Sequence, residues 1–425
     1  MGVIRVGKRI LKAVTTPHMR DIIKQWLFKG YMVSFHFSRR ERTVAPFGVN
    51  LIGHIRGDFG LGESCRLVAG SIYYSGIPVA VINVPQNGSA VETNLEWTKL
   101  EQDAYLYGIN IIHLNPPELS NSLWKLNPSS VRSRYNIAFW LWELPEFPPE
   151  WKYTFQMFDE IWTPAEFVSA SIRRMTDKPV YTMPYGLPQP KTDPVYDRKY
   201  FGLPEEDFLF LVSYDGNSVS ARKNPIGAIR AYKAAFPPGS SGMGIVIKAT
   251  HEKSEYLREL TEELRDCGSL TVLTDSYDKT AFNSLIRCVD VYVSLHRAEG
   301  FGLVMAEAMM LGTPVIATNW SANTEFMDEK TACLVDAALV EIEKEIPPYH
   351  KGNHWAKPDE KQASELMLRL YEDTEFRKTI TQNAIARLTE DYSVQRAAQR
   401  MSERLEQIKS GNHRQTGTST DAPML

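Results

Sequence analysis

The 425-residue sequence has few cysteines, little net charge and no long apolar run. Because no stretch of 18 or more consecutive apolar residues occurs, we expect no segment that spans a membrane. The chain has 48 basic and 51 acidic residues, and its net charge of −3 argues against a protein built to coat nucleic acid. The cysteines form no CxxC pair, which predicts free thiols in a reducing compartment; they are Cys65, Cys267, Cys288 and Cys333.

Residues 1–42 are strongly basic, unlike the chain as a whole. Ten lysines and arginines stand there against two acidic residues, and apolar residues around Trp26 recur near helical spacing. Such a segment suits the headgroup region of an anionic bilayer, and a solvated arm packed on the second domain is the alternative. It lacks the apolar core and cleavage site of a signal peptide. We therefore expect a cytoplasmic protein, and leave open its association with the inner face of a membrane.

The length predicts two domains, because a single hydrophobic core stops growing near roughly 250–300 residues. Short apolar runs alternate with helical patterns from residue 49, stop at a stretch rich in proline and glycine over 184–206, and then resume. This alternation is typical of parallel sheets covered by helices. We expect a basic arm over 1–48, an N-terminal doubly wound domain over 49–190, a C-terminal doubly wound domain with C-terminal helices over 191–409, and a disordered tail over 410–425.

The predicted elements place most polar motifs on loops after strands. The expected strands are 49–55, 79–84, 109–114, 135–141, 180–183, 208–213, 244–249, 270–273, 291–295 and 315–318. The expected helices are 63–74, 165–175, 224–235, 254–267, 279–287, 303–311, 358–375 and 375–409. In open α/β sheets, ligands bind at the carboxyl ends of strands. We therefore expect the chemistry at a cleft between the two domains.

The densest motif lies between Leu295 and Thr318, where a strand leads through Glu299-Gly300-Phe301-Gly302 into a helix that begins near Leu303. The glycines let backbone N–H groups approach a ligand, and the positive helix N-terminus suits a diphosphate. Glu299 and Glu307 can accept hydrogen bonds from two hydroxyls of one elongated ligand. Alternatively, Glu299 is a capping acid and Glu307 a surface residue.

This stretch resembles the signature of the large retaining glycosyltransferase family 4 (group 1), which has the GT-B fold, over about residues 49–405. The resemblance implies that Glu299 contacts the transferred sugar and Glu307 the ribose of the donor. It also implies that backbone amides at Gly300, Phe301 and Gly302 bind the donor phosphates, with Leu303 beside them. The segment with Ser321, Asn323 and Glu325 resembles a further family motif beside the donor.

A second family feature is a basic residue after the first strand of the C-terminal domain. Lys223 matches the family lysine, which stabilises the leaving diphosphate. Asn217 stands at about the place of a family arginine, and Arg222 either substitutes for that arginine or points to solvent. Lys248 ends the next strand and either binds phosphate or has no ligand. Residues 275–278 and Phe282 are placed near the nucleobase by position alone.

The first domain offers weaker signals. The resemblance implies that the loop 57–63, with Gly60, borders the cleft near the acceptor and the donor diphosphate; the alternative is a tight turn without a ligand. Arg66, one helical turn later, is a candidate to face the cleft. His113 ends a strand and is either structural or near the reacting sugar, as in the family. Glu143 follows the run Phe139-Trp140-Leu141-Trp142 and is a candidate acceptor-side base. The aromatic run itself either stacks on a sugar or packs the core.

We therefore expect a hexosyltransferase with a nucleoside diphosphate sugar as its donor and a lipid-linked, oligosaccharide or polysaccharide acceptor. No cofactor is expected. No Asp-x-Asp triplet occurs, which leaves the metal-dependent GT-A arrangement unsupported, and prolines and Gly352 interrupt the spacing of His350 and His354, so no metal site is expected. The alternatives are a GT-B phosphorylase, a nucleotide-sugar epimerase or a non-catalytic GT-B scaffold subunit.

Overall fold

The computed structural model describes residues 30, 44–85, 92–122, 126, 128–252, 254–265 and 269–411. The basic arm expected over 1–48 and the tail expected over 410–425 therefore lie largely outside the described residues. Among the residues that are described, no helix is both long and apolar enough to cross a membrane.

The first domain is a parallel six-stranded sheet in the order β2-β1-β3-β4-β5-β6. Strands β1, β3 and β4 are buried along their whole length, as expected of a parallel sheet covered on both faces. Its strands are β1 (Val49–Gly53), β2 (Val79–Asn83), β3 (Ile109–His113), β4 (Tyr135–Phe139), β5 (Glu160–Thr163) and β6 (Val180–Thr182). Its helices are α3 (Gly60–Tyr74), α4 (Pro116–Ser122), α5 (Pro128–Arg132) and α6 (Glu166–Arg173), with 3-10 helices at η1 (Thr98–Leu100) and η2 (Pro149–Met157).

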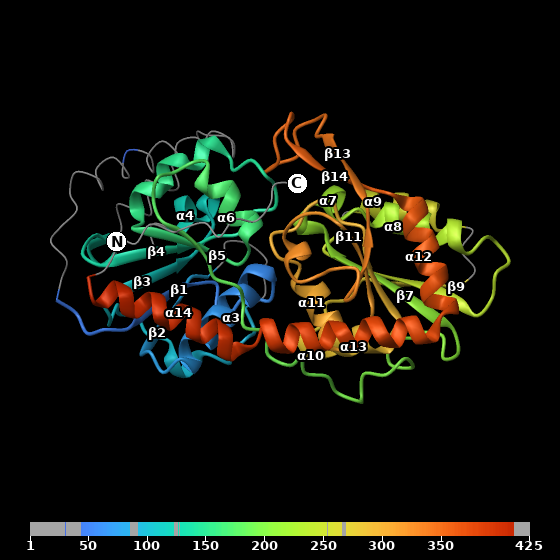
Figure 1. The fold of residues 1–425 in the computed structure, drawn as a ribbon, viewed down its shortest axis with the longest axis horizontal. Coiled ribbons are helices and arrows are strands. Elements are labelled where there is room, and N and C mark those ends of the chain that lie inside the picture. The colour runs from blue at the N-terminus through green and yellow to red at the C-terminus, as the bar shows by residue number, and fades with distance from the viewer. Residues whose placement is uncertain are drawn as a thin grey trace, which may run out of the picture.

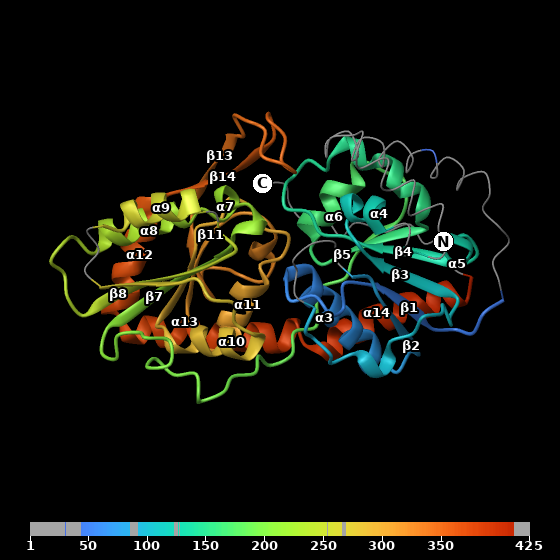
Figure 2. The same cartoon turned by 180° about the vertical axis from the view of Figure 1, so that it is seen from behind.

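The second domain repeats this plan in the order β12-β11-β10-β7-β8-β9. Its strands are β7 (Phe208–Asp215), β8 (Met243–Thr250), β9 (Ser269–Leu273), β10 (Val291–Ser294), β11 (Val315–Thr318) and β12 (Cys333–Val335). Its helical segments are η3 (Gly216–Ser218), α7 (Ser220–Lys223), α8 (Pro225–Ala235), α9 (Ser254–Glu263), α10 (Lys279–Cys288), α11 (Leu303–Met310), η4 (Ala322–Glu325), α12 (Glu360–Glu372) and α13 (Thr374–Asp391). The two lobes stand side by side in Figures 1 and 2. The predicted pair of doubly wound domains is confirmed.

Four strands are absent from the sequence interpretation. Strands β5 (160–163) and β12 (333–335) extend the two parallel sheets beyond the strands that we expected. Strands β13 (Ala337–Glu341) and β14 (His354–Pro358) form an antiparallel hairpin that the sequence did not indicate. Three of the five residues of β13 are exposed and none is buried, so it is not a core strand although it begins with four apolar residues. We call residues 337–358 the interdomain hairpin, because its loop contacts the first domain.

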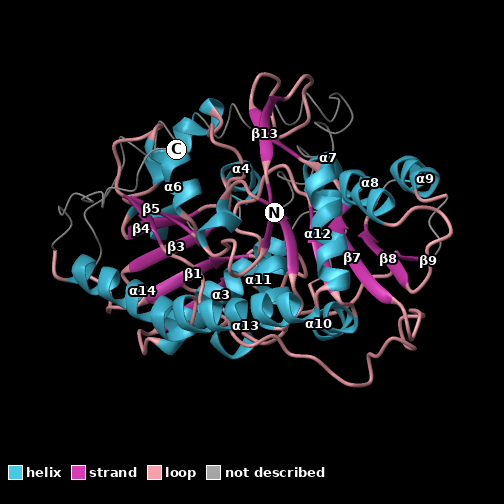
Figure 3. Ribbon diagram, turned by 45° about the vertical axis from the view of Figure 1, so that its right-hand side comes forward, coloured by secondary structure: helices cyan, strands magenta, loops and turns pink. Residues whose placement is uncertain are grey.

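The last helix returns to the first domain. The predicted helix 375–409 is interrupted at Tyr392, and Ser393 caps a new helix, α14 (Val394–Lys409), by accepting a hydrogen bond from the Arg396 amide. Helix α14 packs on α3, and Figures 1 and 3 show α13 and α14 following each other beneath both sheets. The guanidinium of Arg404 lies 2.6 Å from the fully buried carboxylate of Glu160. The structure thus places α14 with the first domain, and not with 191–409 as we expected.

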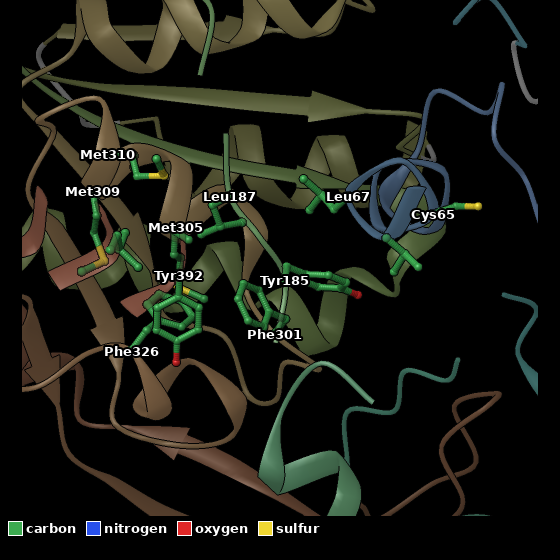
Figure 4. Close-up of a cluster of buried hydrophobic side chains, with 14 of the residues drawn as sticks. Cys65, Leu67, Tyr185, Leu187, Phe301, Met305, Met309, Met310, Phe326 and Tyr392 are labelled. Atoms are coloured by element: carbon green, nitrogen blue, oxygen red, sulfur yellow. The ribbon is translucent and has the colours of Figure 1, made fainter. Parts of the chain in front are cut away.

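An aromatic cluster joins the two domains (Figure 4). The ring of Tyr185, after β6, lies 4.8 Å from that of Phe301, whose ring is 5.2 Å from Phe326. The ring of Tyr392 lies 5.8 Å from Phe326. All four side chains are buried or nearly so. The packing of this aromatic cluster therefore fixes the loop that carries the predicted donor motif.

Candidate active site

The loop after β10 holds the predicted donor motif at the carboxyl edge of the second sheet. Gly302 precedes α11 with φ +98°, and an added Cβ would meet the Met305 side chain at 2.4 Å, so a glycine is required there. A Cβ on Gly300 would lie 3.2 Å from the backbone oxygen of Trp142 in the first domain. The motif therefore lies where the two domains meet. The ring of Phe301 belongs to the aromatic cluster, which leaves only its backbone for a ligand.

Glu299 lies in a buried cluster with two cations. One of its oxygens pairs with the Lys223 ammonium and lies 3.1 Å from an Arg222 nitrogen. Arg222 is 4% exposed and also donates to the backbone oxygen of Ala298 at 2.7 Å. It therefore points inward, not to solvent. The Arg222 Nε is buried without a partner among the described residues.

The backbone on either side of α7, which carries Arg222 and Lys223, is strained. Val219 (φ 63°) and Asn224 (φ 52°) both adopt left-handed conformations on either side of α7. Such conformations are uncommon outside glycine, and the strain energy is especially high for a β-branched residue such as valine. The Asn224 amide donates to the backbone oxygen of Leu295 at 2.8 Å, which ties the segment to the end of β10. Lys223 and Glu299, which are 76 residues apart in the sequence, are thereby brought together.

The cluster shifts the ionisation of its members. Burial opposes the charged form of Glu299, but the charges of Lys223 and Arg222 outweigh it and lower the pKa of Glu299 to about 2. Burial lowers the pKa of Lys223, against the attraction of Glu299. Glu299 is thus an anion at neutral pH, and the cluster holds ready-made charges out of bulk water.

Glu307 lies inside α11, 7% exposed, and is not a surface residue. One oxygen pairs with the Lys279 ammonium at the start of α10. The other oxygen, Oε2, is buried without a partner among the described residues. Burial raises the pKa of Glu307, and the charge of Glu63 from the first domain raises it further. We did not single out Lys279, although its place at a helix start after β9 was a signal.

The glycine loop is a tight turn in which Gly62, and not Gly60, is indispensable. A Cβ on Gly62 would lie 2.0 Å from the backbone oxygen of Gly57, whereas one on the exposed Gly60 would meet nothing within 4 Å. Arg66 is buried and donates to the backbone oxygens of Ile55 and Gly57 at 3.0 and 2.8 Å. Arg66 therefore holds the loop and does not face the cleft.

The positions of the side chains decide two open alternatives and correct one expectation. His113 is fully buried, 2.7 Å from the Ser64 hydroxyl and stacked on Phe139, and burial lowers its pKa to about 3. It is a neutral core residue and not an acceptor-side group. Trp140 and Trp142 are also buried, so the aromatic run packs the core. Asn217 is exposed on η3 and does not take the place of an arginine beside Glu299.

Glu325 is likewise displaced from its expected role beside the donor. Its two oxygens accept hydrogen bonds from the backbone amides of Glu166 and Phe167, 2.9 and 2.8 Å away, at the start of α6 in the first domain. Leu303 begins α11 half-buried, as expected, and Glu143 is half-buried after β4. Lys248 is buried under the ring of Tyr277, and burial lowers its pKa to about 8.

Comparison with known proteins agrees with this geometry. Residues 243–345 match the family model described as Glycosyl transferases group 1. Among solved structures, Alr3699/HepE from Anabaena in complex with UDP and glucose has a TM-score of 0.61 and 16% identity, over 85% of this chain and 99% of that one. The fold is GT-B. Sucrose-phosphate synthase from Thermosynechococcus elongatus gives a TM-score of 0.59 and 14% identity over 86% of this chain and 100% of its own.

A glycosyltransferase from Rickettsia africae gives a TM-score of 0.60 and 12% identity, covering 86% of this chain and 99% of its own. No curated protein matched the sequence. The resemblance to group 1 glycosyltransferases with the GT-B fold is thus confirmed. The matched segment includes both Glu299 and Glu307. In this GT-B chain both carboxylates lie at the junction of the two Rossmann-like domains.

Proposed function

We propose that this protein transfers a hexose, with retention of configuration, from a nucleoside diphosphate sugar to a glycan or lipid-linked acceptor. The observation that carries the proposal is the unpartnered, buried Glu307 Oε2 on the helix that follows Glu299. A buried carboxylate oxygen without a hydrogen-bond partner destabilises the protein, unless a bound ligand donates a hydrogen bond to it. A ribose hydroxyl of the donor supplies such a partner.

The cation cluster supports the same reaction. A diphosphate that enters beside Lys223 competes with Glu299 for the ammonium, which frees a Glu299 oxygen for a hydroxyl of the transferred sugar. Negative charge grows on the leaving diphosphate as the glycosidic bond breaks. In this proposal Lys223, Arg222 and the N-terminus of α11 stabilise that charge. A diphosphate oxygen on the same face then takes the proton of the acceptor hydroxyl.

The first experiment is a donor screen. UDP-, GDP-, ADP- and dTDP-sugars are compared by thermal shift and by release of the nucleoside diphosphate, starting with UDP-glucose because HepE was solved with UDP and glucose. We expect one nucleotide class to bind and turn over. Turnover that requires phosphate would indicate a phosphorylase, and an isomerised sugar still attached to its nucleotide would indicate an epimerase.

Glu307→Ala tests the assignment of the site. Loss of one ribose hydrogen bond should weaken donor binding by about 1–3 kcal/mol, that is, roughly 5- to 150-fold. Glu375→Ala, on the exposed first turn of α13, is the matched control and should leave donor binding unchanged. A folded Glu307→Ala protein with wild-type donor Kd would refute the ribose contact.

A further inference from the structure

Helix α6 of the first domain receives its N-terminal cap from the second domain. The residue before the helix is Ala165, whose methyl group cannot accept a hydrogen bond from the first helical amides. Instead, the carboxylate of Glu325, on η4, accepts hydrogen bonds from the amides of Glu166 and Phe167 at 2.9 and 2.8 Å. A negative charge at that end of a helix also suits the helix dipole. Because the cap comes from the other domain, it is kept only while the two domains are in contact.

An aromatic contact and a backbone hydrogen bond complete this junction. The ring of Trp320, just before η4, lies edge-on to the ring of Phe167 with 5.8 Å between the centroids. The hydroxyl of Tyr392, between α13 and α14, donates to the backbone oxygen of Glu325 at 3.2 Å. Figures 1 and 2 show α6 on the side of the first lobe that faces the second. Glu325 is therefore held through both its side chain and its backbone.

The same segment fixes the backbone of Glu299, the first carboxylate of the donor motif. The amide of Glu299 donates to the Ser321 hydroxyl at 2.9 Å, and its backbone oxygen accepts from the Ala322 amide at 3.3 Å. Ser321 is 4% exposed and has a φ of 75°, which is uncommon for a residue with a side chain. Such strain persists only where the surrounding structure enforces it. The position of Glu299 thus depends on the position of residues 321–325.

The centre of η4 is anchored in the core, so its two ends are rigidly connected. The side-chain amide of the fully buried Asn323 donates to the backbone oxygen of Thr318 at 3.0 Å. The oxygen of that side chain lies 3.0 Å from a ring nitrogen of His296, which is also fully buried. A continuous set of hydrogen bonds therefore leads from the first amides of α6, through Glu325 and η4, to the peptide of Glu299.

We propose that Glu325 is a positioning residue that couples the contact between the two domains to the placement of Glu299 at the reaction centre. This inference rests on the proposed glycosyltransferase function, in which Glu299 contacts the transferred sugar. While Glu325 caps α6, Ser321 and Ala322 hold the peptide of Glu299 on both sides. If the first domain moves away, Glu325 loses both hydrogen bonds and the peptide of Glu299 gains freedom. Because small misplacements near the reacting atoms lower rates strongly, the reaction is fastest when the domains are in contact.

Glu325→Ala tests the proposal because it removes both hydrogen bonds to α6. The assay uses the most rapidly hydrolysed donor of the screen, with water as the acceptor. We expect kcat to fall about 10-fold, while the donor KM and the Kd of the nucleoside diphosphate stay within about twofold. Glu325→Gln keeps one acceptor oxygen and should recover part of the rate. Glu325→Ala combined with Ser321→Ala should be no slower than the slower single variant, because both changes act through one set of hydrogen bonds.

Hydrogen exchange measures the coupling without any substrate. The Glu299 amide donates to the Ser321 hydroxyl, so it is protected from exchange only while that hydrogen bond holds. We expect Glu325→Ala to speed amide exchange about 10-fold in peptides that span residues 298–302, relative to the wild-type protein.

Asp359→Ala is the matched control. Asp359 caps α12 by accepting hydrogen bonds from the amides of Lys361 and Gln362 at 2.9 and 3.1 Å, but this cap lies within one domain. The control should lower the melting temperature about as much as Glu325→Ala and leave kcat and the exchange of residues 298–302 unaltered.

Two kinds of failure are distinguishable. Wild-type kcat or wild-type exchange in Glu325→Ala, or additive losses in the double variant, would overturn the coupling alone. A wild-type protein that binds and turns over no donor would instead overturn the proposed function and, with it, the role of Glu325 in catalysis.

Discussion

Glu299→Gln isolates the charge of the buried carboxylate with little change in shape. In the wild-type protein the pKa of Glu299 is about 2 instead of the ordinary 4.5. Since each pKa unit corresponds to about 1.4 kcal/mol, the ionised carboxylate stabilises the folded state at neutral pH by on the order of 3 kcal/mol. The amide removes this stabilisation and leaves Lys223 and Arg222 buried without their counter-ion. Breaking buried pairs in this way typically costs about 3–5 kcal/mol.

The pH dependence has a definite sign. The folded-state pKa is depressed, so the stabilisation is fully present above the unfolded-state value near 4.5 and is lost as pH falls toward 2. Below pH 4.5 the unfolded carboxyl takes up a proton first, which favours unfolding. The difference in stability between the wild-type protein and Glu299→Gln should therefore be constant from pH 6 to 8 and fall to less than half at pH 3.

Urea unfolding at pH 7 and pH 3 measures this difference. Tryptophan fluorescence and far-UV circular dichroism should be followed together, because two domains need not unfold in one step. Glu375→Gln is the control. Glu375 pairs with Lys378 on the surface, with 82% of its side chain exposed, so the substitution should leave the free energy of unfolding nearly unchanged. The reasoning would be refuted if Glu299→Gln lowered the free energy of unfolding no more than the control does. It would also be refuted if this decrease were as large at pH 3 as at pH 7.

Three further outcomes are expected. Lys223→Ala should lower kcat by about 10²–10³-fold with a smaller change in donor KM, and Lys223→Arg should recover part of the rate; a raised KM with unchanged kcat would point to Arg222 instead. Removal of residues 1–42 should weaken sedimentation with anionic vesicles at low salt, and equal partitioning would exclude a membrane role for the arm. Arg404→Met should cost about 3–5 kcal/mol in urea unfolding by stranding the Glu160 carboxylate, and Glu160→Gln in the same chain should restore much of it.

The sequence predicted most strands of the two parallel sheets, including the three-residue β6, and missed β5, β12 and the two hairpin strands. Strand β5 has four residues and starts with Glu160, whose charge is balanced by Arg404, 244 residues further along the chain. The hairpin strands are short and partly exposed, so neither burial nor periodicity marks them. Such elements are decided by tertiary partners, which a local pattern does not contain.

In the candidate site, too, residues within one short segment were predictable and residues brought in by other elements were not. Glu299 and Glu307 were predictable because a strand, a glycine loop and a helix fix their relation within one short segment. Lys279 reaches Glu307 only through the packing of separate elements. The alternatives for His113 stayed open because the end of a strand predicts an edge of the sheet but not which face receives the side chain.

The return of α14 to the first domain has a consequence for the order in which the protein is made. On the ribosome, residues 44–190 emerge long before Val394–Lys409, which cover α3 and supply the counter-ion of Glu160. Until the last helix is synthesised, the first domain lacks the Arg404 counter-ion of Glu160, which starts β5 next to the edge strand β6, and one face of α3 is uncovered. Its folding is therefore completed only after the second domain has left the exit tunnel, so a nascent chain truncated before α14 offers chaperones an unfinished first domain.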